Sequence, residues 1–320
     1  MPRLQDGMAG WIAEAGRCGY DHIGELPHRI YENLRGRRPV GEVVQVWEDG
    51  GEIAGLAING RFGEAFDVLA APALRGTDAE REMLRTAAVT TAALTTGQYV
   101  ATDLFECDAT RIRLLTALGF THFRTWDHVN EVDLTAPVPE PRVPDGYAVR
   151  AARMSDADGL AEARNESFGD DWTGERYRSE FMMKPGYDPD QEIVVEAPDG
   201  RIAAFTICWV DPRNRSGHFE PVGTHRDFQR RGLARAAMLW GMRRMAERGI
   251  TMASVNHNAE NVPARKLYES IGFTRRFETY GFRRETAAIK ADCTDQGQTH
   301  ADQRSNHVRL PLIDGKGGER

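Results

Sequence analysis

The chain has 320 residues, about the length of two ordinary domains. With 41% hydrophobic, 28% charged and 8% aromatic residues, its composition is that of a globular protein and excludes a largely disordered chain. Its 41 basic and 48 acidic residues give a net charge of −7, so we expect neither nucleic acid nor an anionic membrane as a partner.

The first 20 residues lack the apolar core of a signal peptide, because Asp6, Glu14 and Arg17 interrupt them. No stretch approaches the ~20 consecutive apolar residues of a membrane helix. The nine histidines include no HExxH spacing. Four cysteines are scattered without a CxxC pair and predict neither a disulfide framework nor a zinc-ligand set: Cys18, Cys107, Cys208 and Cys293. We therefore expect a cytoplasmic protein without a metal.

Two pairs of similar segments divide the chain into comparable halves. Residues 48–58 (EDGGEIAGLAI) resemble residues 197–207 (APDGRIAAFTI), and each pairs a turn rich in Asp and Gly with an apolar strand. Residues 113–123 (RLLTALGFTHF) resemble residues 266–277 (KLYESIGFTRRF). Because both matches come in the same order at nearly the same offset, they predict a duplicated domain.

Proline marks the boundary between the halves. Four prolines fall within residues 136–146, a spacing that forbids a helix or central strand and predicts an extended linker. We therefore expect domains at residues 1–135 and 147–285. Residues 286–320 have no aromatic residue and are rich in Gln, Asp and Gly, which predicts a largely disordered tail with 307–313 as its only segment able to dock.

A predicted strand at 219–224 and a predicted helix at 232–248 enclose the most informative segment of the chain. The helix carries an apolar stripe at helical spacing, which we assign to the core: Leu233, Ala237, Met238, Gly241, Met242 and Met245.

The turn between that strand and helix has the sequence QRRGLA at 229–234. A glycine and a small residue at a helix start leave backbone N–H groups uncovered, and these donors and the helix dipole favour a phosphate or pyrophosphate. Arg230, Arg231 and Arg235 add positive charge. The alternative interpretation is a solvated arginine-rich turn with a glycine cap.

The segment after this helix, together with the turn, carries a resemblance to a known family. A predicted strand at 250–258 leads to a short predicted helix that ends at Gly272, and then to a final strand or strand pair. Together, Q-x-x-G-x-A after a strand and N-x-x-A-x-x-L-Y-x-x-x-G-F some thirty residues later resemble the GNAT superfamily of acyl-CoA-dependent N-acetyltransferases. The resemblance is closest for residues 146–285. Residues 227–234 (DFQRRGLA) and 267–273 (LYESIGF) look like stretches of the N-terminal ribosomal-protein alanine acetyltransferases and of many small-amine acetyltransferases.

The resemblance implies an α/β (α+β) fold of two tandem GNAT-like domains, each a mixed, mostly antiparallel sheet flanked by helices. It implies acetyl-CoA as co-substrate. The strand Val222, Gly223 and Thr224 would pair with the pantetheine arm, and Asn261 would hydrogen-bond that arm further along. The coenzyme A pyrophosphate would rest on these residues: Gln229, Arg230, Arg231, Gly232, Leu233, Ala234 and Arg235.

Acetyl transfer to an amine needs a base and a proton donor. An alkyl amine, with a pKa near 10.4 for Lys, is mostly protonated at neutral pH, and the departing thiolate needs a proton. Tyr268 stands where the family places that donor, although a core aromatic would also fit. For the base we favour Glu220, which could also be an ordinary exposed strand acid. His218 is the alternative, because alternation along the strand puts it on the same face as Glu220.

The first half departs from the family where binding matters. Residues 72–84 match the pyrophosphate loop without its Q-x-x-G-x-A pattern, Asp108 stands in place of Asn261, and Leu115 stands in place of Tyr268. We interpret this half as a degenerate copy that completes a substrate cleft or packs structurally. Tandem arrangements of this kind resemble the mycothiol synthases and some antibiotic-modifying acetyltransferases, and no motif singles out either.

The sequence therefore predicts an N-acetyltransferase that acts by direct attack of a primary amine on acetyl-CoA. The acceptor would be a small molecule or a peptide, bound by residues 156–189, and the protein would be a monomer or homodimer. Two other hypotheses stay open: a non-catalytic acyl-CoA-binding or regulatory module, and a peptide aminoacyltransferase that uses charged tRNA.

Overall fold

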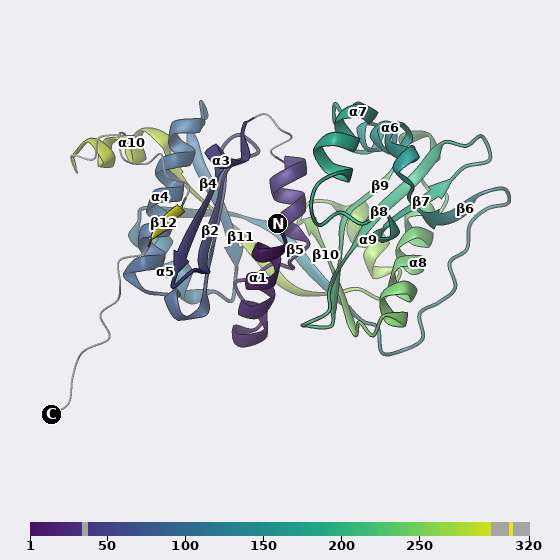
Figure 1. Ribbon diagram of the computed structural model, residues 1–320, viewed down its shortest axis with the longest axis horizontal. Helices are drawn as coiled ribbons and strands as arrows, with labels where there is room; N and C mark the ends of the chain where they lie inside the picture. The colour runs from purple at the N-terminus through teal and green to yellow at the C-terminus, as the bar shows by residue number, and fades with distance from the viewer. Residues whose placement is uncertain (34–37, 296–306, 310–320) are drawn as a thin grey trace. The chain divides into compact units, whose positions relative to one another are not determined.

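The computed structural model of the chain describes residues 1–33, 38–295 and 307–309 (Figure 1). The chain folds into two compact units, which we describe separately. Unit 1 comprises Met1–Gly36, Asp103–Asp108 and Phe123–Gly281. Unit 2 comprises Arg37–Thr102, Ala109–His122 and Phe282–Arg320. Among the described residues, no helix is both long and apolar enough to cross a membrane.

Unit 1 is built on a mixed sheet with the strand order β4-β11-β5-β10-β9-β8-β7-β6. The pairs from β6 to β9 are antiparallel, as is β5 with β10, whereas β9 and β10 run parallel. The strands that lie wholly in unit 1 are β6 (Ala148–Ala151), β7 (Glu192–Glu196), β8 (Ile202–Asp211), β9 (Ser216–Thr224) and β10 (Met252–Asn258). Those that lie partly in it are β4 (Tyr99–Phe105), β5 (Thr121–Asp133) and β11 (Thr274–Glu285).

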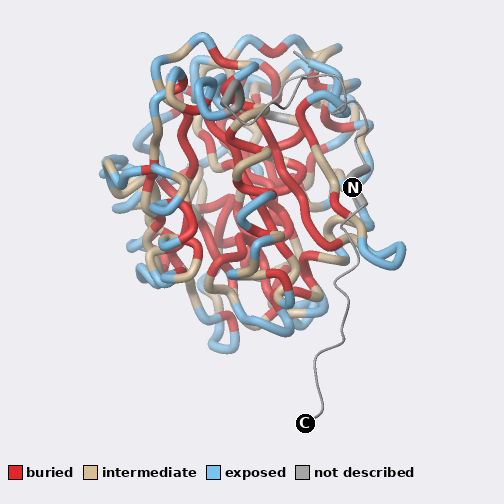
Figure 2. The backbone as a smooth tube through the Cα atoms, turned by 90° about the vertical axis from the view of Figure 1, so that its left-hand side faces the viewer, coloured by how far each residue is buried: buried red, intermediate tan, exposed pale blue. Residues whose placement is uncertain are grey.

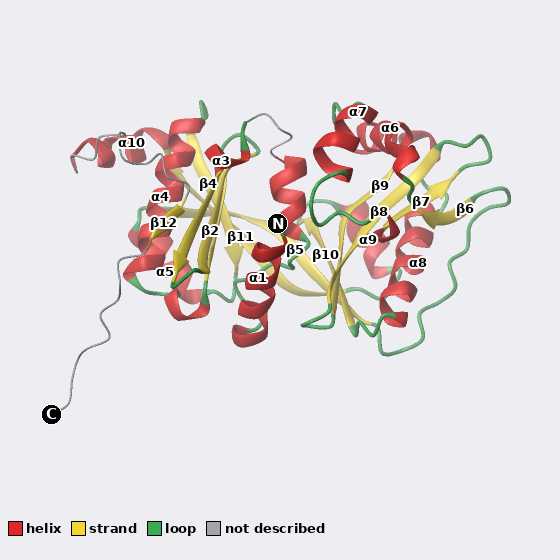
Figure 3. Ribbon diagram, in the orientation of Figure 1, coloured by secondary structure: helices red, strands yellow, loops and turns green. Residues whose placement is uncertain are grey.

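Helices cover both faces of this sheet (Figure 3). On β8, Ala204 and Cys208 pack towards α8 (Leu233–Glu247), while Phe205, Ile207 and Trp209 pack towards α6 (Ala157–Phe168) and α7 (Gly174–Tyr177). Strand β8 is therefore buried along almost all of its length. Figure 2 shows that buried backbone segments lie in the interior and that exposed segments lie at the periphery. The apolar stripe predicted on α8 is buried as expected, and Gly241 lets the helix approach Cys208 and Phe219 closely.

Unit 1 has further short elements around this sheet. Its remaining α-helices are α1 (Pro2–Ala15), α2 (Glu25–Pro27) and α9 (Val262–Glu269). π-helical turns occupy His28–Asn33 and Arg178–Met182, and 3-10 turns occupy Met154–Asp156, Pro189–Gln191 and Arg226–Phe228. The predicted Pro-rich linker, residues 136–146, contains neither helix nor strand.

Unit 2 contains the strand order β12-β1-β2-β3-β4, together with the ends of β5 and β11. Strands β1, β2 and β3 pair antiparallel, and β12 pairs parallel with β1. Its elements are α3 (Val40–Val43), β1 (Val44–Asp49), β2 (Glu52–Arg61), β3 (Ala65–Ala70), a 3-10 turn (Pro72–Leu74), α4 (Asp78–Leu94), α5 (Ala109–Ala117), α10 (Thr286–Asp295) and β12 (His307–Arg309). Helix α4 packs on β2 and β3.

The order of elements repeats along the chain. The first half runs β1-β2-β3-α4-β4-α5-β5, and the second runs β7-β8-β9-α8-β10-α9-β11. The mixed sheet and the repeated order agree with the predicted tandem fold. The compact units, however, place residues 1–36 and most of β5 in unit 1 with the second half, so the domain limits at 1–135 and 147–285 remain predictions about the sequence repeat.

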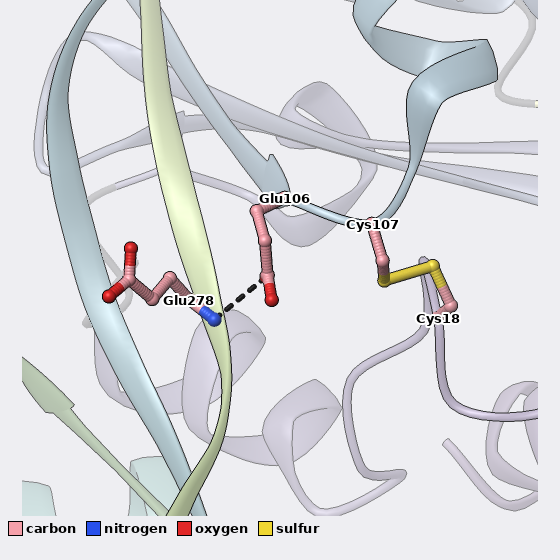
Figure 4. The surroundings of a disulfide bond; sticks show 4 residues. All are labelled: Cys18, Glu106, Cys107 and Glu278. Atoms are coloured by element: carbon pink, nitrogen blue, oxygen red, sulfur yellow. Dashed lines mark hydrogen bonds between the residues drawn. A yellow bond between two sulfur atoms is a disulfide. The ribbon is translucent and has the colours of Figure 1, made fainter.

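Two expectations from the sequence are wrong. Residues 286–295 of the predicted disordered tail form α10, where Ile289 is buried. His307–Arg309, within the segment predicted to dock, pair with β1, while 296–306 and 310–320 lie outside the described residues. Cys18 and Cys107, which no local pattern connects, form a disulfide within unit 1 across a separation of 89 residues (Figure 4). Next to it, the Glu278 backbone N–H donates to the Glu106 carboxylate at 2.7 Å. Cys208 is a free, buried cysteine, as expected of a core residue.

Candidate active site

The turn before α8 leaves the helix N-terminus bare. Arg230 and Gly232 both adopt positive φ angles, 63° and 76°, and Gly232 is the N-cap. No described side chain caps this end, and a Cβ built on Gly232 would meet nothing within 4 Å. The first turn of α8 contains no acidic residue. The predicted phosphate turn therefore presents backbone donors and the positive end of a helix dipole to open space.

The arginines of this turn differ in how the protein holds them. The Arg231 guanidinium donates to Tyr147 Oη at 2.7 Å and to the Asp227 carbonyl at 3.2 Å, and it stacks on Phe228. Arg230 is exposed and Arg235 is half-buried. Positive charge is thus concentrated at the same end of α8 as the bare N–H groups, as the sequence predicts.

Strand β9 has an open edge beside this helix N-terminus. It pairs with β8 up to Thr224, but its parallel pairing with β10 ends at Phe219 opposite Val255. Among the described strands, none pairs with the β10-facing edge of β9 from Glu220 onwards. Gly223 lies so close to the Phe205 ring that a Cβ there would collide with it. The backbone of 222–224 is therefore available to an extended ligand on one side.

Glu220 lies at the beginning of this open edge. Its side chain is 20% exposed, and its Oε1 lies 3.3 Å from His28 Nε2. Burial raises the pKa of Glu220 to about 7, while the neighbouring His28 acts to lower it. A carboxyl group with such a pKa accepts a proton from an amine at neutral pH, so its environment suits a general base.

His218, the alternative base, is completely buried and both of its ring nitrogens have protein partners. Nε2 lies 2.9 Å from Glu25 Oε1, and Nδ1 lies 2.9 Å from Ser254 Oγ. A ring nitrogen of His218 also lies within 4.8 Å of a Glu220 carboxylate oxygen, which agrees with the predicted common face. These contacts suit His218 to a supporting role and leave Glu220 as the more accessible base.

Glu25, His218 and Glu220 together have a donor spacing that a metal ion could use. Oxygen atoms of Glu25, however, already accept hydrogen bonds from Asn256 and Arg29, and the Arg29 cation lies against this carboxylate. Although burial alone would raise the pKa of Glu25, Arg29 and His218 hold it well below its usual range. The Glu25 carboxylate therefore has its hydrogen-bond partners and its neutralising charge within the protein.

Tyr268 projects from α9 and is 6% exposed. Its ring contacts those of His257 and Phe273. Burial, and then the negative charge of Glu220, raises the pKa of Tyr268 above its ordinary value. The phenol therefore keeps its proton at neutral pH, which is the state that a general acid requires.

Asn261 begins the same helix. Its Oδ1 accepts a hydrogen bond from the Ala264 N–H at 3.1 Å, so it is the N-cap of α9. The side chain is exposed, and this cap uses its carbonyl oxygen and leaves the amide group out of the contact. The predicted role in binding the coenzyme would therefore fall to Nδ2.

The N-terminal segment 21–29 contributes residues to this site that no sequence pattern had indicated. Glu25 contacts His218, Arg29 joins Glu25 to Asp21, and His28 contacts Glu220. No motif in DHIGELPHR identifies these residues, because the partners of Glu25 and His28 on β9 lie some 190 residues further along the chain.

The parallel strands β9 and β10 separate beside a bare helix N-terminus, which is the arrangement that the resemblance to the GNAT superfamily predicts. Residues 157–273 match the model of the acetyltransferase (GNAT) family. The chain therefore carries a GNAT acetyltransferase domain, and this segment includes the turn before α8, the open edge of β9 and Tyr268.

Several relatives with curated names are mycothiol acetyltransferases. The protein from Thermomonospora curvata is 32% identical over 168 residues, which are 51% of this chain and 56% of that relative. The protein from Streptomyces bingchenggensis is 30% identical over 183 residues, which are 54% and 58% of the two chains. This chain thus matches little more than half the length of these relatives.

Solved structures share the fold over most of the chain. A tandem GNAT protein from the clavulanic acid biosynthesis pathway gives a TM-score of 0.61 with 14% identity, over 89% of this chain and 94% of that one. A GCN5-related N-acetyltransferase from Sphaerobacter thermophilus gives 0.58 with 21% identity, over 89% and 92%. At these identities the likeness shows the fold alone, and that fold is the predicted tandem GNAT arrangement.

Proposed function

We propose that the chain is an N-acetyltransferase that moves the acetyl group of acetyl-CoA to a primary amine by direct attack. One observation carries the proposal: unit 1 combines a helix N-terminus that lacks a side-chain cap with an open strand edge beginning at the largely buried carboxyl of Glu220. The GNAT family uses acetyl-CoA, and the match to that family covers the helix N-terminus, the open strand edge and Glu220.

Three elements of unit 1 would bind the coenzyme. The backbone N–H groups of 229–234 and the Arg235 side chain would hold the diphosphate, because a bare helix start and a cation both favour an anion. The open edge at 222–224 would hydrogen-bond the pantetheine arm as an added half-strand. Asn261 Nδ2 would bind the arm further along.

The acidic and basic groups would divide the proton transfers between them. Glu220 accepts the proton of the alkylammonium group, so that the amine nitrogen can attack the thioester carbonyl carbon. The N–C bond forms, the C–S bond breaks, and sulfur takes its electron pair. Tyr268 donates its phenolic proton to the sulfur, and the second proton that the nitrogen loses on becoming an amide passes through solvent to restore the phenol. The bound coenzyme supplies the activated acetyl group, and Cys208, buried in the sheet, takes no part.

For the acceptor we propose a small-molecule amine. The support is that several relatives are named mycothiol acetyltransferases, and each of them matches this chain over only part of its length. Residues 156–189, which include α6 and α7 and come before the motif segment, remain the predicted acceptor-binding region.

A thiol-release assay with acetyl-CoA across amine classes tests this function. We expect turnover with at least one small amine, and we expect Glu220→Gln to remove the acid limb of the rate–pH profile. Acetyl-CoA binding without turnover of any amine would favour the non-catalytic module instead. An unchanged acid limb in Glu220→Gln would assign the base to His218 or to a bound water.

A further inference from the structure

The N-terminal segment 21–29 forms a chain of alternating charges that ends at the candidate base. Asp21 Oδ2 accepts from Arg29 at 2.7 Å, and Arg29 Nε donates to Glu25 Oε2 at 3.1 Å. Glu25 Oε1 in turn accepts from Asn256 and lies 2.9 Å from His218. Every one of these residues belongs to unit 1, although the segment precedes the second half by more than a hundred residues.

Two members of this segment face Glu220: the Glu25 carboxylate and the His28 imidazole, which is a cation only when protonated. His28 Nε2 lies 3.3 Å from Glu220 Oε1, close enough for an ion pair when the imidazole is protonated. A carboxylate oxygen of Glu25 lies within 4.8 Å of one of Glu220. A cation at such distances favours the carboxylate form of Glu220, and an anion favours the protonated form.

We propose that His28 and Glu25 are positioning residues of the catalytic base, which set the protonation of Glu220 in opposite directions. The inference rests on the proposed function. It assigns to the N-terminal segment a role in the chemistry of a domain whose family match begins only at residue 157.

Other charged groups also face Glu220, and they form a constant background. Asp127 on β5 adds a second negative charge, and Arg164 on α6 adds a positive one. The Trp209 indole N–H donates to the Glu220 backbone carbonyl at 2.7 Å and holds this part of β9 in place. Substitutions confined to residues 25 and 28 leave all of these groups unchanged, so their effects report on the N-terminal segment.

The test is the pH dependence of kcat/KM, measured with acetyl-CoA and a reactive amine for three variants. His28→Gln removes the cation, and we expect the midpoint of the acid limb to rise by about one pH unit. His28→Lys keeps a cation at all relevant pH values and should place the midpoint at or below that of the wild type. Glu25→Gln removes the anion, and we expect the midpoint to fall by a similar amount.

Glu80→Gln is the matched control, because Glu80 is a buried carboxylate whose partners Arg111 and Gly76 both lie in unit 2. It should leave the acid limb where it is in the wild type. If circular dichroism shows that Glu25→Gln does not fold, the two His28 variants still test the proposal. A purely structural role of His28 would lower activity in both variants and would not shift the midpoint in opposite directions.

The outcomes separate this inference from the function on which it rests. Opposite shifts in His28→Gln and His28→Lys support it. An acid limb that disappears in Glu220→Gln but stays fixed in the His28 and Glu25 variants overturns it and leaves the function standing. An acid limb that survives in Glu220→Gln overturns the assignment of the base itself.

Discussion

Helices α8 and α4 occupy equivalent places in the two halves of the chain, and their N-termini have opposite chemistry. The start of α8 has no acidic residue and three arginines around a bare glycine cap. The start of α4 carries Asp78 and Glu80 in its first turn. There the Gly76 N–H donates to Glu80 Oε2 at 2.6 Å, so a carboxylate from the chain occupies the place of an external anion.

The carboxylate of Glu80 is itself neutralised inside unit 2. It is completely buried, Arg111 donates to its Oε1 at 2.6 Å, and Arg111 also donates to the Val68 carbonyl. Leu115, which replaces the tyrosine of the second half, is also completely buried. The comparison teaches that a side chain of the protein can satisfy a backbone donor next to such a helix start, as Glu80 does for Gly76, whereas the start of α8 has no acidic residue and would suit an external anion.

The largest effect should come from making the second half like the first at the proton donor. Tyr268→Phe removes the phenolic proton while keeping the ring contacts with His257 and Phe273. We expect kcat to fall about 100-fold or more, with acetyl-CoA affinity roughly intact, as for loss of a general acid. Steady-state kinetics and calorimetry measure the two quantities. Unchanged turnover would remove Tyr268 from the mechanism.

The next prediction places an acid at the bare helix start. Gly232→Asp puts a carboxylate at the N-cap of α8, as α4 has one in its first turn at Glu80, and we expect acetyl-CoA affinity to fall about 100-fold through like-charge repulsion. The matched control is Gly249→Asp just beyond the other end of α8. Gly249 is also exposed, has a φ of 79°, and has open space around the position that a Cβ would occupy.

Both glycine variants introduce the same kind of backbone strain, so calorimetry separates strain from site chemistry. Equal losses of affinity in Gly232→Asp and Gly249→Asp would mean that the effect is conformational. Retained affinity in Gly232→Asp would place the coenzyme diphosphate elsewhere.

The converse substitution acts on unit 2. Glu80→Gln removes a carboxylate that forms an ion pair with the buried Arg111 cation, and we expect a loss of about 3 kcal/mol in the free energy of unfolding. Urea denaturation followed by circular dichroism measures it. The kinetic constants for acetyl transfer should stay at wild-type values under conditions where the protein is folded. A marked loss of acetyl-CoA affinity in Glu80→Gln would show that unit 2 takes part in binding.

The features that the sequence predicted correctly depend on residues that are close together in the chain. Strand β9, the turn at 229–234, helix α8 and helix α9 all fall within about 60 consecutive residues, and hydrophobic periodicity, a glycine and a recognisable spacing identify them. The buried stripe of α8 and the Pro-rich connection were predicted for the same reason. Each of these signals acts between residues close in the chain.

What the sequence could not predict is long-range. The Glu25–His218 contact joins residues 193 positions apart, and the Cys18–Cys107 disulfide joins residues 89 apart. Neither pair has a pattern of its own, since charge and thiol chemistry alone do not show which residues meet in space. Helix α10 was missed for another reason: it belongs to a tail, residues 286–320, that has no aromatic residue and is rich in Gln, Asp and Gly, whereas in the structure it packs against α4 and buries Ile289.

The smallest effect concerns how much of the acetyl-CoA affinity comes from arginine side chains at the α8 N-terminus and how much comes from its backbone N–H groups. Arg235→Gln removes one cation from the first turn, and we expect acetyl-CoA to bind about threefold to tenfold more weakly, with a smaller dependence on salt. Arg248→Gln removes a cation at the C-cap of the same helix and should leave the affinity unchanged. Because α4 binds its own carboxylate through a backbone N–H, we expect the backbone donors of α8 to provide most of the affinity. An effect of Arg235→Gln as large as that of Gly232→Asp would reverse this order and make arginine the main determinant.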